Sequence, residues 1–98
     1  MSIHANEASL VGKWVFICGR MAPDETCLRI ESLTKIYLYK LGHDESGWDS
    51  LFIDPHDGRL WELIYPESSL HGGGPPELRH LPETHARAKY GAIVPDAV

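Results

Sequence analysis

Hydrophobic and polar residues follow different periods along the chain, and the first clear pattern is that of a strand. Residues 12–17 (GKWVFI) are apolar and rich in β-forming side chains. The next residues, 19–23, begin with glycine and end with proline, which is typical of a turn. The N-terminal quarter of the chain therefore predicts a strand followed by a turn.

A helical period begins after this turn. Asp24 has a side chain that can cap the free amides of a first helical turn. Apolar residues then recur at spacings of three and four, which places them on one helical face: Cys27, Ile30, Leu33 and Tyr37. Glu25 and Arg29 stand one turn apart and can form an ion pair. We expect this helix to end near residue 39, although residues 36–41 also alternate like a strand.

The middle of the chain carries the signature of a β-hairpin. After a polar loop at 43–47, two strand-like runs at 48–53 and 59–65 flank the sequence Asp-Pro-His-Asp-Gly. Pro55 presets the backbone for a type I turn, and Gly58 can adopt the positive φ that closes it. The second run has apolar residues on both faces, which predicts a central strand.

The C-terminal third predicts a loop, a turn and a second helix. Residues 68–76 (SSLHGGGPP) should form a shaped, ordered loop, with these structural residues: Gly72, Gly73, Gly74, Pro75 and Pro76. Residues 77–81 suggest a short turn, and Pro82 and Gly91 suit the two ends of a last helix. The sequence thus predicts a small α+β domain over residues 1–98, mainly an antiparallel sheet with two helices, with its core at about 10–91.

Composition is consistent with one folded domain of 98 residues, 43% of them hydrophobic. No apolar run is long enough to cross a bilayer and the N-terminus lacks the pattern of a secretory signal, so we expect a cytoplasmic protein. Cys18 and Cys27 should be buried free thiols. Trp14 and Trp61 should be mostly buried, with their indole N–H groups satisfied by the backbone.

Charge is distributed unevenly. Residues 44–67 carry seven acids and one base, a net −6, whereas residues 1–43 carry +1 and residues 68–98 are neutral. An acidic patch repels nucleic acid and membrane phosphates and attracts a basic protein. The alternative is that these acids only form a solvated face that keeps the domain in solution.

Two patterns suggest catalytic chemistry, and neither is complete. The sequence His71-Gly72-Gly73-Gly74 is similar to the oxyanion-hole loop of esterases, but the Gly-x-Ser-x-Gly nucleophile elbow is missing. The turn around His56 has carboxylates without the spacing of a calcium loop, and the six histidines lack zinc-ligand spacing. We therefore expect no catalytic residue, metal or cofactor. A small hydrolase or metal-binding protein built on His71, His56, Asp54 and Asp57 remains the alternative, and a purely structural protein is a third.

Several motifs, taken together, resemble immunity protein 27 of bacterial polymorphic toxin systems. The strongest matches are Gly47-Trp48, residues 54–68 (DPxDGRxWELxYPxS) and residues 71–78 (HGGGPPxL). Weaker matches lie at 12–15, 25–31 and 90–91. The resemblance implies an α+β protein encoded beside a secreted toxin, which protects the producing cell and its kin by binding that toxin.

The acidic segment then supplies candidate contacts for a toxin domain. If the toxin acts on nucleic acid, its cleft should be basic, and acidic loops could occupy or flank it. The candidate partner-binding residues are Asp44, Glu45, Asp49, Asp54, His56, Asp57, Glu67 and His71. The rival interface is the first helix. The sequence leaves open whether the protein is a monomer or a weak dimer.

Overall fold

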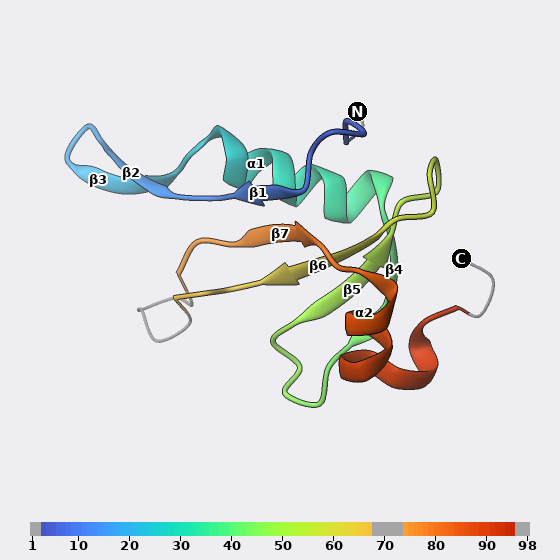
Figure 1. Cartoon of the computed structure of the whole chain (residues 1–98). Coiled ribbons are helices and arrows are strands. Elements are labelled where there is room, and N and C mark those ends of the chain that lie inside the picture. Colours follow the sequence, from blue (N-terminus) through green and yellow to red (C-terminus); the bar gives the residue numbers. More distant parts are fainter. Residues whose placement is uncertain (1–2, 68–73, 96–98) are drawn as a thin grey trace.

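The computed structural model describes residues 3–67 and 74–95 (Figure 1). The first half of the chain contains β1 (Ser9–Val11), β2 (Trp14–Ile17), β3 (Arg20–Pro23), α1 (Glu25–Ser32), a π-helical turn η1 (Leu33–Tyr37) and β4 (Tyr39–His43). The second half contains β5 (Ser50–Ile53), β6 (Leu60–Ile64), β7 (Glu77–His80), α2 (Glu83–Tyr90) and a 3-10 turn η3 (Gly91–Ile93). The predicted α+β class with antiparallel sheets is confirmed.

Five strands form one antiparallel sheet in the order β1-β7-β6-β5-β4. The helices α1 and α2 cover its opposite faces (Figure 1). The predicted central strand is confirmed, since β6 lies in the middle of the sheet. The remaining two strands, β2 and β3, form a separate hairpin that projects beyond the sheet.

Each face of the sheet has its own apolar core, because neighbouring residues of a strand point to opposite faces. Trp61, Phe52 and Leu78 pack with Ile30 and Leu33 of the α1–η1 segment. Leu51, Leu60 and Leu81 pack with Ala86 and Tyr90 of α2 on the other face. The sheet is therefore the middle layer of three, and both helices are held by apolar burial.

Several local signals produce the predicted geometry. The β5–β6 hairpin has its tip at residues 54–58, and Gly58 has φ +77°. The Asp24 side chain accepts a hydrogen bond from Cys27 N at 2.8 Å and caps α1. Gly91 ends α2 at φ +63°. Each of these positions depends on the conformational preference of a single residue, which is why the local sequence reveals them.

The structure corrects the predicted turns at 19–23 and 77–81. Arg20–Pro23 is the strand β3, and the turn is limited to Cys18 and Gly19. Glu77–His80 is the strand β7, which pairs with β1 and β6. Arg20–Pro23 was predicted as a turn because it lies between a glycine and a proline, although its partner β2 is its neighbour in the chain. Glu77–His80 was predicted as a turn because its strand character comes from partners more distant in the chain.

The first helix ends earlier than residue 39. Its last turn widens to a π-helical turn in which Leu38 N donates to Leu33 O at 2.8 Å, and β4 begins at Tyr39. The alternating pattern of residues 36–41 thus marks where the helix gives way to a strand.

Two side-chain predictions are also wrong. Cys27 is buried, but Cys18 is exposed at the turn of the β2–β3 hairpin. Trp61 is fully buried as predicted, yet its indole Nε1 has no hydrogen-bond partner among the described residues. Its ring lies instead under the Arg59 guanidinium, 4.9 Å from the ring centroid, and beside His80. The indole therefore gains a cation–π contact rather than a backbone acceptor.

Within the described residues, no helix is long and apolar enough to cross a membrane.

Candidate functional site

The structure separates the candidate partner-binding residues into two groups at opposite ends of the β5–β6 hairpin. The loop at residues 44–49 precedes β5 and Glu67 follows β6, so both lie at the open end of this hairpin. The residues at 54–58 form the closed end, or tip. The open end thus holds Asp44, Glu45, Asp49 and Glu67, and the tip holds Asp54, His56 and Asp57. His71, Gly72 and Gly73, with most of the predicted ordered loop, lie outside the described residues.

At the tip, Asp54 serves the turn itself. Its side chain is 1% exposed. Its Oδ1 accepts hydrogen bonds from the Tyr37 hydroxyl at 2.7 Å and from the His56 amide at 2.8 Å. The hydrogen bond to Asp54, with burial, raises the pKa of Tyr37 to about 12. This carboxylate therefore holds the turn against the end of η1 and offers little surface to a partner.

Asp57 is also engaged at the tip. Its Oδ2 lies 2.7 Å from Nε of Arg59, and its Oδ1 accepts from the Arg59 amide at 2.9 Å. The same guanidinium donates to the backbone oxygens of Glu7 at 2.8 Å and His4 at 3.0 Å. Asp57 therefore orients an arginine that ties the tip to the N-terminal segment.

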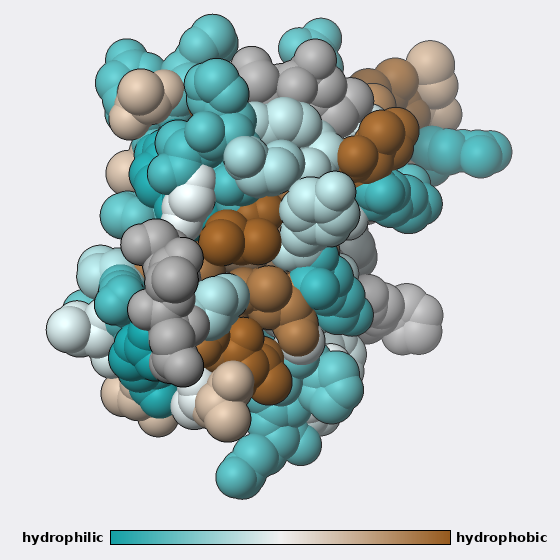
Figure 2. Space-filling view, turned by 90° about the vertical axis from the view of Figure 1, so that its right-hand side faces the viewer, coloured by the Kyte–Doolittle hydropathy of each residue, from teal (hydrophilic) through white to brown (hydrophobic). Residues whose placement is uncertain are grey.

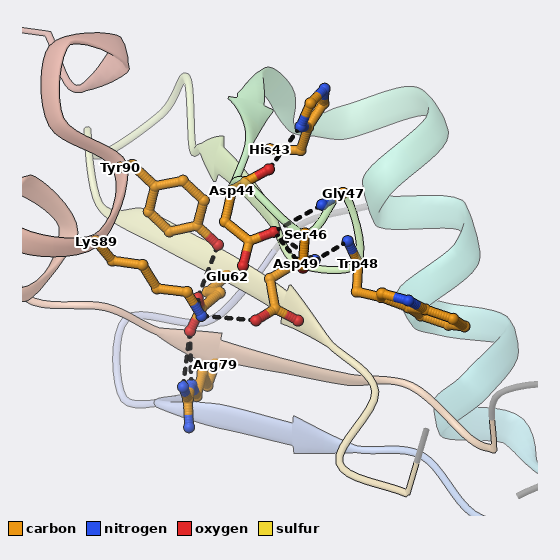
Figure 3. A network of polar contacts seen from close by, with 10 residues as sticks. All are labelled: His43, Asp44, Ser46, Gly47, Trp48, Asp49, Glu62, Arg79, Lys89 and Tyr90. Atoms are coloured by element: carbon orange, nitrogen blue, oxygen red, sulfur yellow. Dashed lines mark hydrogen bonds and ion pairs between the residues drawn. The ribbon is translucent and has the colours of Figure 1, made fainter. Parts of the chain in front are cut away.

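At the open end, Asp44 organises the loop before β5. Its Oδ1 accepts from the Ser46 hydroxyl at 2.7 Å and from the Gly47 amide at 3.0 Å (Figure 3). The hydrogen bond from Ser46 contributes most to lowering the pKa of Asp44, whereas its partial burial opposes the shift. Asp44 thus acts as the cap of a tight turn, as aspartate commonly does.

A buried carboxylate network lies beside this loop (Figure 3). Glu62, on β6, is fully buried, and its oxygens contact Lys89 Nζ at 2.6 Å, the Tyr90 hydroxyl at 2.7 Å and Arg79 Nη2 at 2.8 Å. Lys89 also reaches Asp49 at 2.7 Å. The network joins the central strand, the strand β7 and the helix α2.

The network accounts for the charge state of Glu62. Burial alone would raise the pKa of Glu62, but hydrogen bonds from Lys89, Tyr90 and Arg79 outweigh it and leave that pKa below its ordinary value. Burial, together with the hydrogen bond to Glu62, raises the pKa of Tyr90 above its usual range. Glu62 is therefore ionised and Tyr90 remains a donor near neutral pH.

These contacts reduce the number of carboxylates in the acidic segment, residues 44–67, that are available to a partner. Most of its carboxylates are occupied by the chain itself: Asp44, Asp49, Asp54, Asp57 and Glu62. Arg79 and Lys89 come from outside the segment and offset part of its charge. Glu45 and Glu67 are exposed, and neither has an ion pair within the described parts of the chain. The charge free for a partner therefore lies at the open end.

The open end also carries exposed aromatic and apolar surface. Trp48 is 54% exposed and its ring contacts that of Tyr65 edge-on, with centroids 6.0 Å apart. Tyr65 and Trp14 line one hollow, and Trp14 continues into a neighbouring cleft of about 590 Å³. We call Trp48, Tyr65 and Trp14 the aromatic row. The cleft is lined mainly by Val11, Met21, Pro66, Pro75 and Pro76, and Lys13, Glu67 and Glu77 also border it.

A second side of the molecule also has an apolar surface. Figure 2 presents the side that lies on the right of Figure 1, and hydrophobic side chains gather at its centre within a hydrophilic surround. Ile36 and Tyr39, at the end of η1 and the start of β4, are 77% and 68% exposed. Exposed hydrophobic side chains thus occur on more than one face.

Metal-binding or hydrolytic chemistry finds little support in the residues that the structure describes. They contain no group of three or more histidine, cysteine or acidic side chains placed to hold a metal ion. Of the groups considered for a hydrolase, Asp54 is buried within the turn and His56 is exposed. Asp54 is therefore committed to the turn, and the described residues provide no metal-binding group for such chemistry.

Sequence reasoning missed the Glu62 network and the aromatic row. A charged residue in a strand with two apolar faces is a signal that a buried partner is needed, and Glu62 stands in such a strand. No comparable signal links Trp14 to Tyr65, because their proximity depends on how the strands assemble.

One of three comparisons with known proteins gave a match. Neither the curated proteins nor the solved structures matched the chain. The model of the family described as immunity protein 27 matches residues 16–82. This match spans more than half of the chain and includes β3, α1 and the strands β4 to β7. The chain therefore belongs to the immunity protein 27 family.

Proposed function

We propose that this chain protects the cell that makes it by binding a cognate toxin domain and blocking the surface through which that toxin acts. Membership of the immunity protein 27 family carries this proposal, because it indicates an immunity function and a role other than catalysis. We further propose that the toxin is encoded beside the immunity protein and that the two proteins meet in the cytoplasm.

The open end of the β5–β6 hairpin is the surface best suited to face a basic toxin. Glu45 and Glu67 are exposed there, and no ion pair within the described residues neutralises them. Asp44 and Asp49 add negative potential, although Asp49 shares Lys89. Long-range attraction of this kind increases the rate at which partners meet.

The tip has a different role in this proposal. Asp54 is buried, and Asp57 is held by Arg59, so the tip presents fewer free charges than the sequence suggested. His56 is exposed and could contact a partner. We place the tip outside the centre of the interface. If the toxin is a nuclease, the open end would then flank its basic substrate cleft and exclude phosphates.

The direct test is co-purification of the full chain with the C-terminal domain of the long secreted protein encoded by the neighbouring gene. We expect a stable complex, and survival of cells that express this domain only when the immunity protein is present. Failure of both would overturn the proposed function.

A charge-reversal pair tests which surface faces the toxin. Glu45→Lys with Glu67→Lys should slow association about tenfold or more at low salt, and the effect should shrink as salt screens the charges. Glu25→Lys with Glu83→Lys is the matched control, since it makes the same change in net charge at two exposed positions elsewhere. Equal association rates for the two variants would show that the open end does not steer the encounter.

A further inference from the structure

The β2–β3 hairpin is structurally incomplete. Its two strands pair with each other over Trp14–Ile17 and Arg20–Pro23, and no other described strand pairs with either of them. Figure 1 shows it extending beyond the five-stranded sheet. An isolated two-stranded sheet is marginally stable in water unless a further surface packs on it. Within the described chain α1 contacts β3 near the base of the hairpin, but Phe16 and Met21 near its turn remain exposed. Further packing on this outer part is therefore expected to come from a partner.

The apolar side chains of this hairpin are exposed. Phe16 is 72%, Met21 56% and Ile17 52% exposed. Phe16 and Met21 are directly paired across the strands, so they share one face of the hairpin. Alternation along β2 places Trp14 on the same face. This face thus combines two exposed anchors with Trp14, one member of the aromatic row.

The turn of the hairpin gives it a defined shape. Cys18 and Gly19 have φ of +51° and +80°, so both central residues of the turn adopt positive φ. Such turns match the right-handed twist of the flanking strands. Phe16 and Met21 are therefore presented on a preformed surface, which lowers the entropic cost of binding.

Charge indicates the chemistry of the occupant. Lys13 and Arg20 are the charged residues within 11–23, and the stretch contains no acid. Both side chains are exposed, and neither takes part in an ion pair within the described residues. Two copies packed hairpin to hairpin would bring like charges together, whereas a partner with carboxylates would compensate them.

The hairpin is continuous with the open end, the surface that we propose faces the toxin. Trp14 and Met21 line the cleft of about 590 Å³, and Glu67 of the open end also borders this cleft. An interface centred on the hairpin can therefore include the cleft and the free carboxylate of Glu67. Interfaces usually combine a few desolvated anchors with a charged rim in this way.

We propose that the β2–β3 hairpin anchors the toxin domain, with Phe16 and Met21 inserted into an apolar surface of the toxin that is flanked by carboxylates facing Lys13 and Arg20. This inference rests on the proposed function and adds the surface that gives the complex its lifetime. The acidic residues of the open end contribute to the association rate, and the hairpin slows dissociation.

The test uses the full chain, the purified cognate toxin domain and the double variant Phe16→Gln with Met21→Gln. We expect its Kd to rise about a hundredfold or more, mainly through faster dissociation and at all salt concentrations. The matched control is Leu28→Gln with Ile36→Gln, which alters two side chains of similar exposure, 52% and 77%, on α1 and η1. The control should bind within about threefold of the parent chain.

Each alternative result has a defined meaning. If the parent chain binds the toxin and the hairpin variant binds equally well, the inference is overturned while the proposed function stands. If the control variant loses binding instead, the interface lies on α1, and the inference is again overturned. If the parent chain alone forms a dimer that the hairpin variant does not form, the occupant is a second copy. If the parent chain fails to bind the toxin, both proposals fail.

The charge component has its own variant. Lys13→Glu with Arg20→Glu should weaken binding about tenfold or more at low salt, and less at high salt. Tighter binding of this variant would contradict a carboxylate-flanked toxin surface. Circular dichroism and urea unfolding of every variant establish that the chain is folded in each binding measurement.

Discussion

Two regions of this protein reverse the usual placement of polar and apolar residues. In the central sheet, the charged residue Glu62 is fully buried, and both of its carboxylate oxygens have ion-pair or hydrogen-bond partners. In the β2–β3 hairpin, Phe16 and Met21 are largely exposed although they are hydrophobic. Burial of Glu62 costs desolvation free energy, which its ion pairs and hydrogen bonds offset. The hairpin leaves apolar surface in water, which the fold alone does not require.

The comparison separates a region that stabilises the fold from the region that we propose binds the partner, within a chain of 98 residues. Glu62 connects β6, β7 and α2 and so fixes the arrangement of the sheet and its second helix. The hairpin can be altered without disturbing either apolar core, because its exposed side chains belong to neither. The exposed side chains of the hairpin can therefore vary while both apolar cores remain unchanged.

The largest effect should come from removing the buried carboxylate. Glu62→Ala should lower the free energy of unfolding by about 3 kcal/mol, because Arg79, Lys89 and Tyr90 lose their shared acceptor. The low end of the usual range applies, since Lys89 and Arg79 are 34% and 43% exposed and can be rehydrated. Urea unfolding measures the change. Glu77→Ala, on the adjacent strand, is the control and should cost less than about 0.5 kcal/mol.

A second test addresses the junction between the two regions. Gly12 joins β1 to β2, and a Cβ there would lie 2.6 Å from Pro76 O and 2.7 Å from Cys27 Sγ. Gly12→Ala should cost about 2 kcal/mol because backbone or core must shift. Gly58→Ala should cost about 1 kcal/mol, since its Cβ has open space and only φ of +77° is unfavourable. Equal costs would show that the junction is less tightly packed than its distances indicate.

The pH dependence of unfolding should distinguish the partly buried ion pair of Glu7 and Arg29 from the exposed pair of Glu31 and Lys35. Arg29 contacts both oxygens of Glu7 at 2.7 and 2.8 Å, and this contact, with the His4 amide, lowers the pKa of Glu7 from 4.5 to about 2. Because the folded-state pKa is depressed, the stabilisation is present above about pH 4.5 and is lost as the pH falls towards 2.

The variant Glu7→Gln should therefore cost about 1 kcal/mol at neutral pH, and the difference from the parent chain should disappear by about pH 2. Urea unfolding at a series of pH values checks this. Glu31→Gln, which removes an exposed pair with Lys35, should cost less than about 0.5 kcal/mol. A constant difference for Glu7→Gln across the pH range would contradict the assigned ion pair.

The smallest effect on stability is expected in the hairpin. Phe16→Gln with Met21→Gln should change the free energy of unfolding by less than about 0.5 kcal/mol, because both side chains are already exposed. Chemical denaturation decides the point. A loss comparable to that of Glu62→Ala would mean that the hairpin belongs to the cooperative core, and the division between the two regions would fail.

The sequence predicted those parts of the fold that depend on neighbouring residues. Asp24 as a cap, Gly58 in the tip and Gly91 at the end of α2 each act through their own backbone or an adjacent amide. The strands β3 and β7 were missed because turn-like residues at their ends suggested turns. Their strand character depends on pairing with β2, β1 and β6, which local composition does not encode.

The site was less predictable than the fold. The sequence identified the acidic segment but could not show which acids have partners. Asp49 is compensated by Lys89, 40 positions later, and Glu62 by Arg79, 17 positions later. The sequence also could not predict which hydrophobic residues are exposed, because β2 has the composition of a buried strand. Partner-binding by the candidate residues remains a prediction for the experiments above.

The order of strands in the sheet has a consequence for the time at which protection can begin. Ser9 of β1 pairs with Arg79 of β7, 70 positions later. During synthesis β1 must wait for β7 to leave the ribosome, and at about 5–20 residues per second that delay is several seconds. The β5–β6 hairpin can form earlier, since its pairing is local. A chain that is still being synthesised therefore lacks the complete sheet. Its immunity function becomes available only after most of the sequence has been translated.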